Sequence, residues 1–188
     1  MLLDTLGAMV GAGNVLTGDQ VSSRSVSWAD HSPCRARAIV RPGSTDEVSR
    51  VLAACHAADQ PVVTLGGLTG LVQGCVPAEH EIALSLERMH RIESVDAVGR
   101  TMSVEAGVAV QRIQEEAEQH GLLYPVDFGA RGSAHIGGSV ATNAGGNGVI
   151  RYGMTRDSVL GLEAVLADGT VIPAMNRMIK NNAAYDVK

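Results

Sequence analysis

The chain has 188 residues, of which 45% are hydrophobic and only 3% aromatic, and its formal net charge is −5. This length and apolar share suffice to bury the core of one domain, or of two small lobes that share an interface, and they argue against a disordered chain. The negative charge and the lack of a basic block disfavour nucleic-acid binding, because that affinity depends on clustered Lys and Arg.

The three cysteines, Cys34, Cys55 and Cys75, are widely spaced and form no C-x-x-C pair. The sequence therefore predicts neither a disulfide framework nor a thiolate zinc site. The histidines show no H-E-x-x-H spacing, and we predict no metal site and no catalytic residue in this chain. We find no signal peptide and no apolar run of about 18 residues, so we expect no membrane span and, by default, a cytoplasmic location.

Apolar periodicity predicts an α+β chain. The clearest helix start is at Ser44, because Ser44 and Glu47 have capping-box spacing and apolar residues recur behind them at i, i+3, i+4 and i+7. The clearest hairpin turn is at Asp168-Gly169. In chain order, we predict a short helix within residues 1–12, an irregular polar stretch 17–32, a strand 36–40, a helix 45–57, strands 61–65, 82–85, 91–95 and 101–105, a helix 110–120 and strands 159–166 and 170–172.

A first candidate site follows the strand that ends at Leu65, in the sequence Gly66-Gly67-Leu68-Thr69-Gly70-Leu71. A glycine turn directly after a strand can point several peptide N–H groups into one concavity that suits an anion. A Walker A loop would need a Lys, and residues 61–80 contain neither Lys nor Arg; a Rossmann loop would open a helix, which Pro77 soon prevents. An ordinary glycine turn between strands stays open as the alternative.

A second candidate site is denser, with seven glycines between Gly129 and Gly148. A disordered linker would not carry Ile136 and Val140 in its middle. Backbone without side chains suits close approach to a flat ligand, although a tightly packed backbone crossing is the alternative. Two glycine loops about 60 residues apart favour one long ligand, with phosphate on the first loop and a ring system on the second. FAD fits this description, and so would other dinucleotides.

The stretch from Pro125 to Ile172 resembles the flavin-binding core of the FAD-linked oxidases of the vanillyl-alcohol oxidase type. The motifs that carry the resemblance are Gly-Ser-Ala-His-Ile-Gly-Gly-Ser-Val-Ala-Thr-Asn-Ala-Gly-Gly at 132–146, Arg-Tyr-Gly at 151–153 and Val-Leu-Gly-Leu-Glu-Ala-Val-Leu-Ala-Asp-Gly-Thr-Val at 159–171. The similarity extends over nearly the whole chain from about Ala36. Within the family it is greatest to the branch of D-2-hydroxyglutarate dehydrogenase, D-lactate dehydrogenase and the glycolate oxidase flavin subunit.

The resemblance implies an α+β fold, namely a PCMH-type FAD-binding domain of two α/β lobes. Residues 1–35 would form an N-terminal helix and surface segment, residues 36–86 the first lobe with the pyrophosphate loop, and residues 87–188 an incomplete second lobe. Family members continue into a C-terminal cap domain that supplies substrate and metal ligands. We therefore expect this chain to be a truncated fragment that binds FAD non-covalently and weakly, or not at all, and that tends to self-associate as a homo-oligomer.

The resemblance also assigns residues to FAD, position by position. In the full-length protein we expect Gly137→Val or Gly138→Val to remove the flavin with little change in folding, because a branched side chain would occupy the cofactor's space. The residues assigned to the pyrophosphate are Gly66, Gly67, Leu68, Thr69, Gly70 and Leu71, and those assigned to the isoalloxazine and ribityl pocket are Pro125, Ser133, Ile136, Gly137, Gly138, Thr142, Asn143, Gly145 and Gly153.

The activity that the resemblance implies is oxidation of a D-2-hydroxy acid by hydride transfer to flavin N5 in the full-length protein. The substrate would be held by the missing cap domain, so we expect the chain alone to be inactive. A non-catalytic flavin- or nucleotide-binding module is the alternative. A reductase that shares the flavin domain, such as enolpyruvyl-glucosamine reductase, is a weaker one because its second glycine motif differs.

Overall fold

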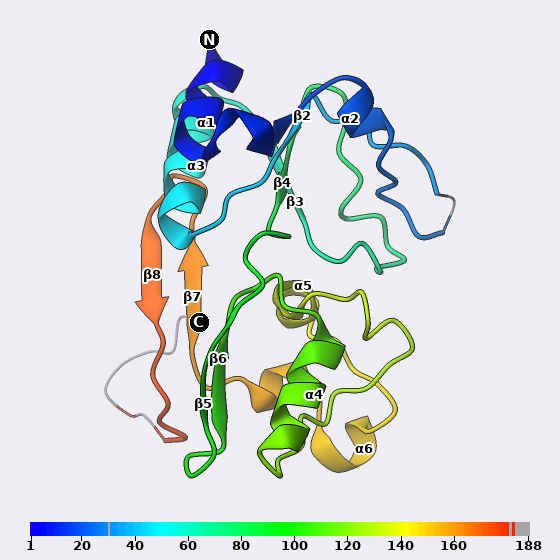
Figure 1. The fold of residues 1–188 in the computed structure, drawn as a ribbon, viewed down its shortest axis with the longest axis vertical. Coiled ribbons are helices and arrows are strands. Elements are labelled where there is room, and N and C mark those ends of the chain that lie inside the picture. The colour runs from blue at the N-terminus through cyan, green and yellow to red at the C-terminus, as the bar shows by residue number, and fades with distance from the viewer. Residues whose placement is uncertain (30, 181, 183–188) are drawn as a thin grey trace.

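The computed structural model describes residues 1–29, 31–180 and 182 (Figure 1). The end of the predicted second lobe, at 181 and 183–188, therefore lies outside the described residues. In chain order the elements are α1 (Leu2–Val10), the 3-10 turn η1 (Ala12–Asn14), β1 (Val15–Leu16), α2 (Asp19–Ser22), β2 (Ala38–Val40), α3 (Thr45–Ala57), β3 (Val62–Leu65), β4 (Ile82–Ser85), β5 (Ile92–Asp96), β6 (Thr101–Val104), α4 (Val110–Gln119), α5 (Ile136–Ala141), α6 (Val149–Tyr152), the 3-10 turn η2 (Thr155–Ser158), β7 (Leu162–Val165) and β8 (Val171–Ala174).

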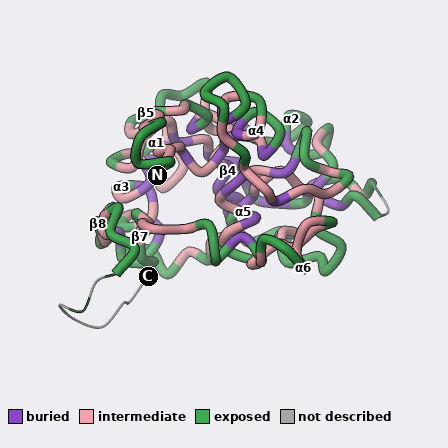
Figure 2. Tube along the Cα trace, turned by 90° about the horizontal axis from the view of Figure 1, so that it is seen from below, coloured by how far each residue is buried: buried purple, intermediate pink, exposed green. Residues whose placement is uncertain are grey.

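A four-stranded sheet in the order β1-β2-β4-β3 organises the N-terminal part, with β2, β4 and β3 parallel and β1 antiparallel to β2. Side chains alternate between its faces. Ile82 and Leu84 of β4 point to one face, where α1 and α3 cover them, and Ala83 points to the other, where Val21 and Val26 lie. Figure 2 shows β4 buried along its length, whereas β8 is only partly buried. The sheet is therefore buried on both faces.

Helix α3 begins and ends at the predicted residues, because its N-terminus is capped as predicted. The Ser44 side chain accepts a hydrogen bond from the Glu47 N–H at 3.2 Å. The Glu47 carboxylate accepts from the N–H of Gly43 at 2.7 Å, one residue before the capping residue. Two backbone donors at the helix start are thus satisfied.

The strands β5 and β6 and the helices α4 and α5 form a second core. The buried side chains of Val108, Ile113 and Ile136 meet there, with Val104 and Val140 packed against them. Helix α4 contributes Ile113 from the apolar side of a helix whose other side is polar. This cluster fixes where α5 lies, below the loop that follows β3 (Figure 1).

The β7–β8 hairpin turns at Gly169 and packs against α3 of the N-terminal part (Figure 1). Gly169 has a φ of +88°, and the Ser49 hydroxyl donates to its carbonyl at 2.6 Å. A Cβ added to Gly169 would lie 2.6 Å from the Ser49 carbonyl oxygen, so glycine is needed both for the turn and for the contact. The predicted hairpin therefore packs back against the N-terminal half of the chain. The boundary between two lobes at residue 86 stays a prediction.

Several elements differ from the sequence-based expectations. The stretch 17–32 contains helix α2, and the strand predicted over 159–166 spans only Leu162–Val165. Helices α5 and α6 lie where irregular glycine backbone was expected. These helices are four to six residues long, so they carry little periodic signal. Among the described residues, no helix is long and apolar enough to cross a membrane.

Candidate functional site

The two glycine loops meet at Gly67. A Cβ added to Gly67 would fall on the Ser133 carbonyl oxygen and lie 2.8 Å from both Ala134 Cα and His135 N. A Cβ on the preceding residue, Gly66, would lie 3.8 Å from Gly138 Cα. The first loop therefore lies directly against the backbone that enters α5, and a side chain at position 67 would separate them.

The backbone N–H groups of the first loop have no hydrogen-bond partner among the described residues. None of the six residues from Gly66 to Leu71 donates a backbone hydrogen bond to another described residue. Leu68 has a φ of +57°, which turns the backbone within this row, and a Cβ added to Gly70 would meet open space. These residues are half-buried or exposed, so their six consecutive N–H groups are free to bind an anion or water.

Gly137 and Gly138 have different surroundings at the start of α5. The N–H of Gly137 donates to the Ala106 carbonyl at 2.8 Å, and a Cβ on Gly137 would lie 2.8 Å from Ala106 Cβ. Gly138 has open space where its Cβ would be, and its N–H donates to no described residue. Our expectation that valine at either position would spare the fold is therefore wrong for Gly137, which packs against the protein, and is kept for Gly138.

The polar side chains at the end of α5 are bonded within the protein. The Thr142 hydroxyl donates to the Gly138 carbonyl at 2.9 Å, and Asn143 Oδ1 accepts from the N–H of Arg156 at 2.9 Å. Thr155, which is fully buried, donates its hydroxyl to the Ala144 carbonyl at 2.7 Å. These bonds hold the chain after α5 in place, and Thr155 is a structural residue that sequence reasoning missed.

The C-terminal part of the glycine stretch packs as a backbone crossing. A Cβ on Gly146 would lie 2.7 Å from the Asp127 carbonyl carbon, and a Cβ on Gly148 would lie 3.1 Å from the Pro125 carbonyl oxygen. At Gly146 and Gly148, glycine is therefore needed because two backbone segments pack closely together. Gly153 has a φ of +78° and follows the last residue of α6, so glycine is favoured there by the backbone conformation.

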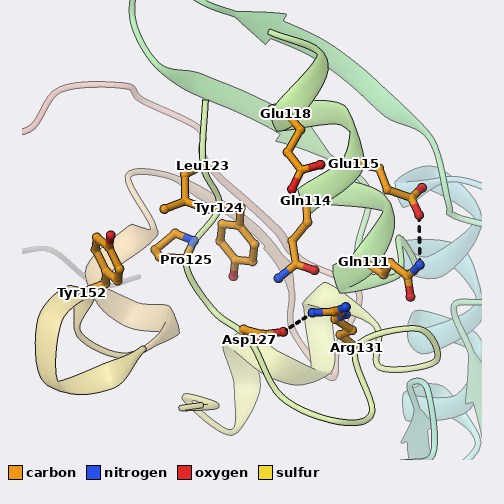
Figure 3. Close-up of a pocket in the computed structure, with 10 residues that line it drawn as sticks. All are labelled: Gln111, Gln114, Glu115, Glu118, Leu123, Tyr124, Pro125, Asp127, Arg131 and Tyr152. Atoms are coloured by element: carbon orange, nitrogen blue, oxygen red, sulfur yellow. Dashed lines mark hydrogen bonds and ion pairs between the residues drawn. The ribbon is translucent and has the colours of Figure 1, made fainter. Parts of the chain in front are cut away.

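A shallow hollow of about 340 Å³ lies between α4 and the segment 123–127 (Figure 3). Beside it, Arg131 Nη1 donates to Asp127 Oδ1 at 2.6 Å, and this hydrogen bond lowers the pKa of Asp127. Of the predicted site residues only Pro125 lines it. The residues around the hollow are Gln111, Gln114, Glu115, Glu118, Leu123, Tyr124, Pro125, Asp127, Arg131 and Tyr152.

Charged groups lie close to the meeting point of the loops. Glu87 accepts hydrogen bonds from Arg24 Nη1 at 2.7 Å and from Arg41 Nη1 at 3.1 Å. Burial raises the pKa of Glu87, but the hydrogen bonds and charges of the two arginines lower it below its ordinary value overall, so Glu87 stays ionised. Burial lowers the pKa of His135, so its imidazole is neutral near pH 7. No group of described residues could hold a metal ion.

The structure therefore brings together some of the predicted site residues and separates others. The first loop meets the entrance to α5, and a Cβ added to Gly138 or to Gly70 would meet no atom within 4 Å. Pro125 lies at the hollow beside α4, and Gly153 lies at the end of α6. The spacing of Ile136, Ser139 and Val140 at i, i+3 and i+4 was a signal that could have found α5.

Comparison with known proteins gives one family model, the FAD binding domain, which matches residues 36–174. A probable mitochondrial D-2-hydroxyglutarate dehydrogenase of Oryza sativa subsp. indica is 42% identical over 94% of this chain and 32% of its own length. A D-2-hydroxyglutarate dehydrogenase of Xanthomonas citri pv. viticola is 46% identical over 80% of this chain and 32% of its own length. The chain thus spans about a third of the curated relatives it matches. The mitochondrial location in the rice protein's name gives no support to the cytoplasmic location expected from the sequence.

Solved structures share the fold at low sequence identity. Alkyldihydroxyacetonephosphate synthase matches with a TM-score of 0.81 and 19% identity, over 93% of this chain and 34% of that protein. p-Cresol methylhydroxylase matches with a TM-score of 0.74 and 23% identity, over 91% of this chain and 34% of that protein. The α+β, PCMH-type fold expected from the sequence is confirmed.

Proposed function

The chain belongs to the FAD binding domain family, and we propose that it binds FAD without a covalent bond where the first loop meets the entrance to α5. The observation that carries this proposal is the row of six unpaired N–H groups from Gly66 to Leu71. A pyrophosphate carries negative charge and many acceptor oxygens, and oriented peptide N–H groups suit it without any Lys or Arg. Gly70 and Gly138 leave room beside this row.

The residues of the chain would hold and orient the cofactor. Gly66 to Leu71 would donate to the pyrophosphate, and the N–H of Gly138 would add a donor from the opposite side. Ser133 and Ile136 belong to the backbone that fixes this second side against the first. We retain Gly137, Thr142, Asn143, Gly145, Gly153 and Pro125 as proposed pocket residues that act by shaping the backbone or by contacts at the flavin end.

For the whole protein we propose the oxidation of a D-2-hydroxy acid, such as the D-2-hydroxyglutarate in the names of the relatives. When bound, FAD supplies at flavin N5 the acceptor for the hydride that leaves the α-carbon of such an acid. The chain's own part in this activity is to position the cofactor and to exclude water from the face it covers. Oligomeric state stays a prediction.

We expect FAD to bind the purified chain and to leave it in acid. The first loop contains neither His nor Cys. The Cys75 thiol donates a hydrogen bond to the Val26 carbonyl, and His135 is half-buried at the entrance to α5. The chain is titrated with FAD, and the quenching of flavin fluorescence is followed. After acid precipitation, yellow colour should be found in the supernatant. Flavin in the pellet would contradict the non-covalent proposal, and no binding at all would contradict the site.

We also expect that the 188-residue chain reduces no bound flavin when a 2-hydroxy acid is added. Hydride transfer needs the substrate held about 3–3.5 Å from the acceptor atom. The first loop carries no cationic side chain, and Arg131 of the second loop is paired with Asp127. The assay is anaerobic bleaching of bound flavin with D-2-hydroxyglutarate, D-lactate and glycolate, with dithionite as the positive control. Bleaching at an enzyme-like rate would show that a complete substrate site is present.

A non-catalytic flavin- or nucleotide-binding module is the second candidate function. The same N–H groups would bind the pyrophosphate of ADP or of a dinucleotide, because they contact phosphate and no base. Titrations with FAD and with ADP distinguish the flavin domain from the nucleotide-binding module. Equal affinity for ADP and FAD would favour the module, and clearly tighter FAD binding would favour the flavin domain.

A further inference from the structure

Trp28 is the only tryptophan of the chain, and 62% of its surface is exposed. It lies in the turn between Ser25 and Pro33, which are joined by an antiparallel bridge. An indole ring buries a large apolar area when it is covered and tends to be found where partners bind. A single exposed apolar residue needs no explanation, but Trp28 has exposed apolar neighbours in an adjoining segment.

That adjoining segment continues the first loop. Leu71, Val72 and Val76 are 66%, 87% and 40% exposed. The segment is tied to the turn that carries Trp28, because the Cys75 thiol donates to the Val26 carbonyl at 3.3 Å, two residues before Trp28. The two segments run side by side in Figure 1. We call Trp28, Leu71, Val72 and Val76 the apolar lip.

The apolar lip overlaps the unpaired N–H groups of the first loop at Leu71. Gly66 to Leu71 carry unpaired backbone N–H groups, and exposed apolar side chains begin at Leu71 and continue at Val72. Leu68 and Cys75 pack into the core that contains Val26, so the backbone between the two regions is anchored. A ligand that fits both regions carries an anionic group next to a flat apolar group. FAD has this form on either side of its pyrophosphate, since adenine and isoalloxazine are both planar heteroaromatic rings.

We propose that the apolar lip covers a planar ring of the bound FAD, with the Trp28 indole against the face or edge of that ring. The proposal rests on the proposed function, since it places the ring next to a pyrophosphate on the first loop. Stacking between an aromatic side chain and a base tolerates any planar ring, because every such ring has a π-face. Trp28 is thus a positioning residue for the cofactor.

The test measures the affinities of FAD, ADP and riboflavin for the purified chain and three variants. Trp28→Ala is expected to weaken FAD binding about ten-fold, equivalent to about 1.4 kcal/mol. Trp28→Phe keeps a ring and should stay within about three-fold of the wild type. Val98→Ala is the control, because Val98 is 96% exposed in the turn between β5 and β6 and lies outside the lip. The same loss for ADP would assign the ring to adenine, and the same loss for riboflavin would assign it to isoalloxazine.

The outcomes separate this inference from the proposed function. Tight FAD binding by the wild type with no loss in Trp28→Ala would overturn the role of the lip and leave the proposed site intact. No FAD binding by the wild type would overturn both. A changed oligomeric state in Trp28→Ala with unchanged FAD affinity would assign the lip to a protein partner and overturn the proposal. Circular dichroism of each variant checks that Trp28→Ala is folded.

Discussion

Valine in place of Gly138 is expected to weaken FAD binding by at least about 100-fold, equivalent to about 2.7 kcal/mol, while the fold is kept. A Cβ at this position meets no protein atom within 4 Å, so the valine side chain would extend into the space proposed for the cofactor. Valine also forms helix slightly better than glycine, by roughly 0.4 kcal/mol, so α5 should not be destabilised. Fluorescence titration gives the affinity, and thermal unfolding gives the stability.

Two variants control for the effect of Gly138→Val. Gly13→Val adds the same side chain in open space at η1, away from both loops, and should leave FAD affinity and stability unchanged. Gly137→Val should unfold at clearly lower temperature, because its Cβ would lie 2.8 Å from Ala106 Cβ. Normal FAD affinity in a folded Gly138→Val variant would mean that α5 turns this face to solvent rather than to the cofactor.

The regular elements with strong local signals could be predicted from the sequence. Helix α3 was found with its true bounds because the cap at Ser44 and an apolar stripe agree. The turn at Gly169 was found because Asp-Gly is a strong two-residue turn signal. Its contact with Ser49 of α3 could not be foreseen, since 120 residues separate the two and no local pattern encodes a long-range contact.

The candidate site could be predicted only in part. Glycine density indicated two backbone surfaces, and the structure does bring Gly67 against Ser133. Composition cannot tell which glycines face a ligand and which face the protein, because both kinds lack a side chain for the same steric reason. Gly137 and Gly146 pack against the chain's own backbone or side chains, whereas Gly138 borders open space. That distinction depends on the direction of each missing Cβ, which only the folded backbone defines.

Alanine in place of Gly67 is expected to separate the two loops. Its Cβ would overlap the Ser133 carbonyl oxygen and lie 2.8 Å from Ala134 Cα and His135 N. These are backbone atoms, which cannot rotate away as the end of a flexible side chain can. Overpacking of this kind costs about 3 kcal/mol at the upper end of its usual range. For a chain of this length, that corresponds to a fall in Tm of roughly 6–12 °C.

Gly67→Ala should also abolish FAD binding, because the unpaired N–H groups of the first loop would no longer face Gly138. The matched control is Gly70→Ala, three residues along the same loop, whose Cβ meets nothing within 4 Å. Its Tm should stay within about 2 °C of the wild type, because no atom has to move. Differential scanning calorimetry of the two variants provides the comparison. If Gly67→Ala were as stable as Gly70→Ala and kept its FAD affinity, the loops would not be in backbone contact, and the proposed meeting point of the site would be wrong.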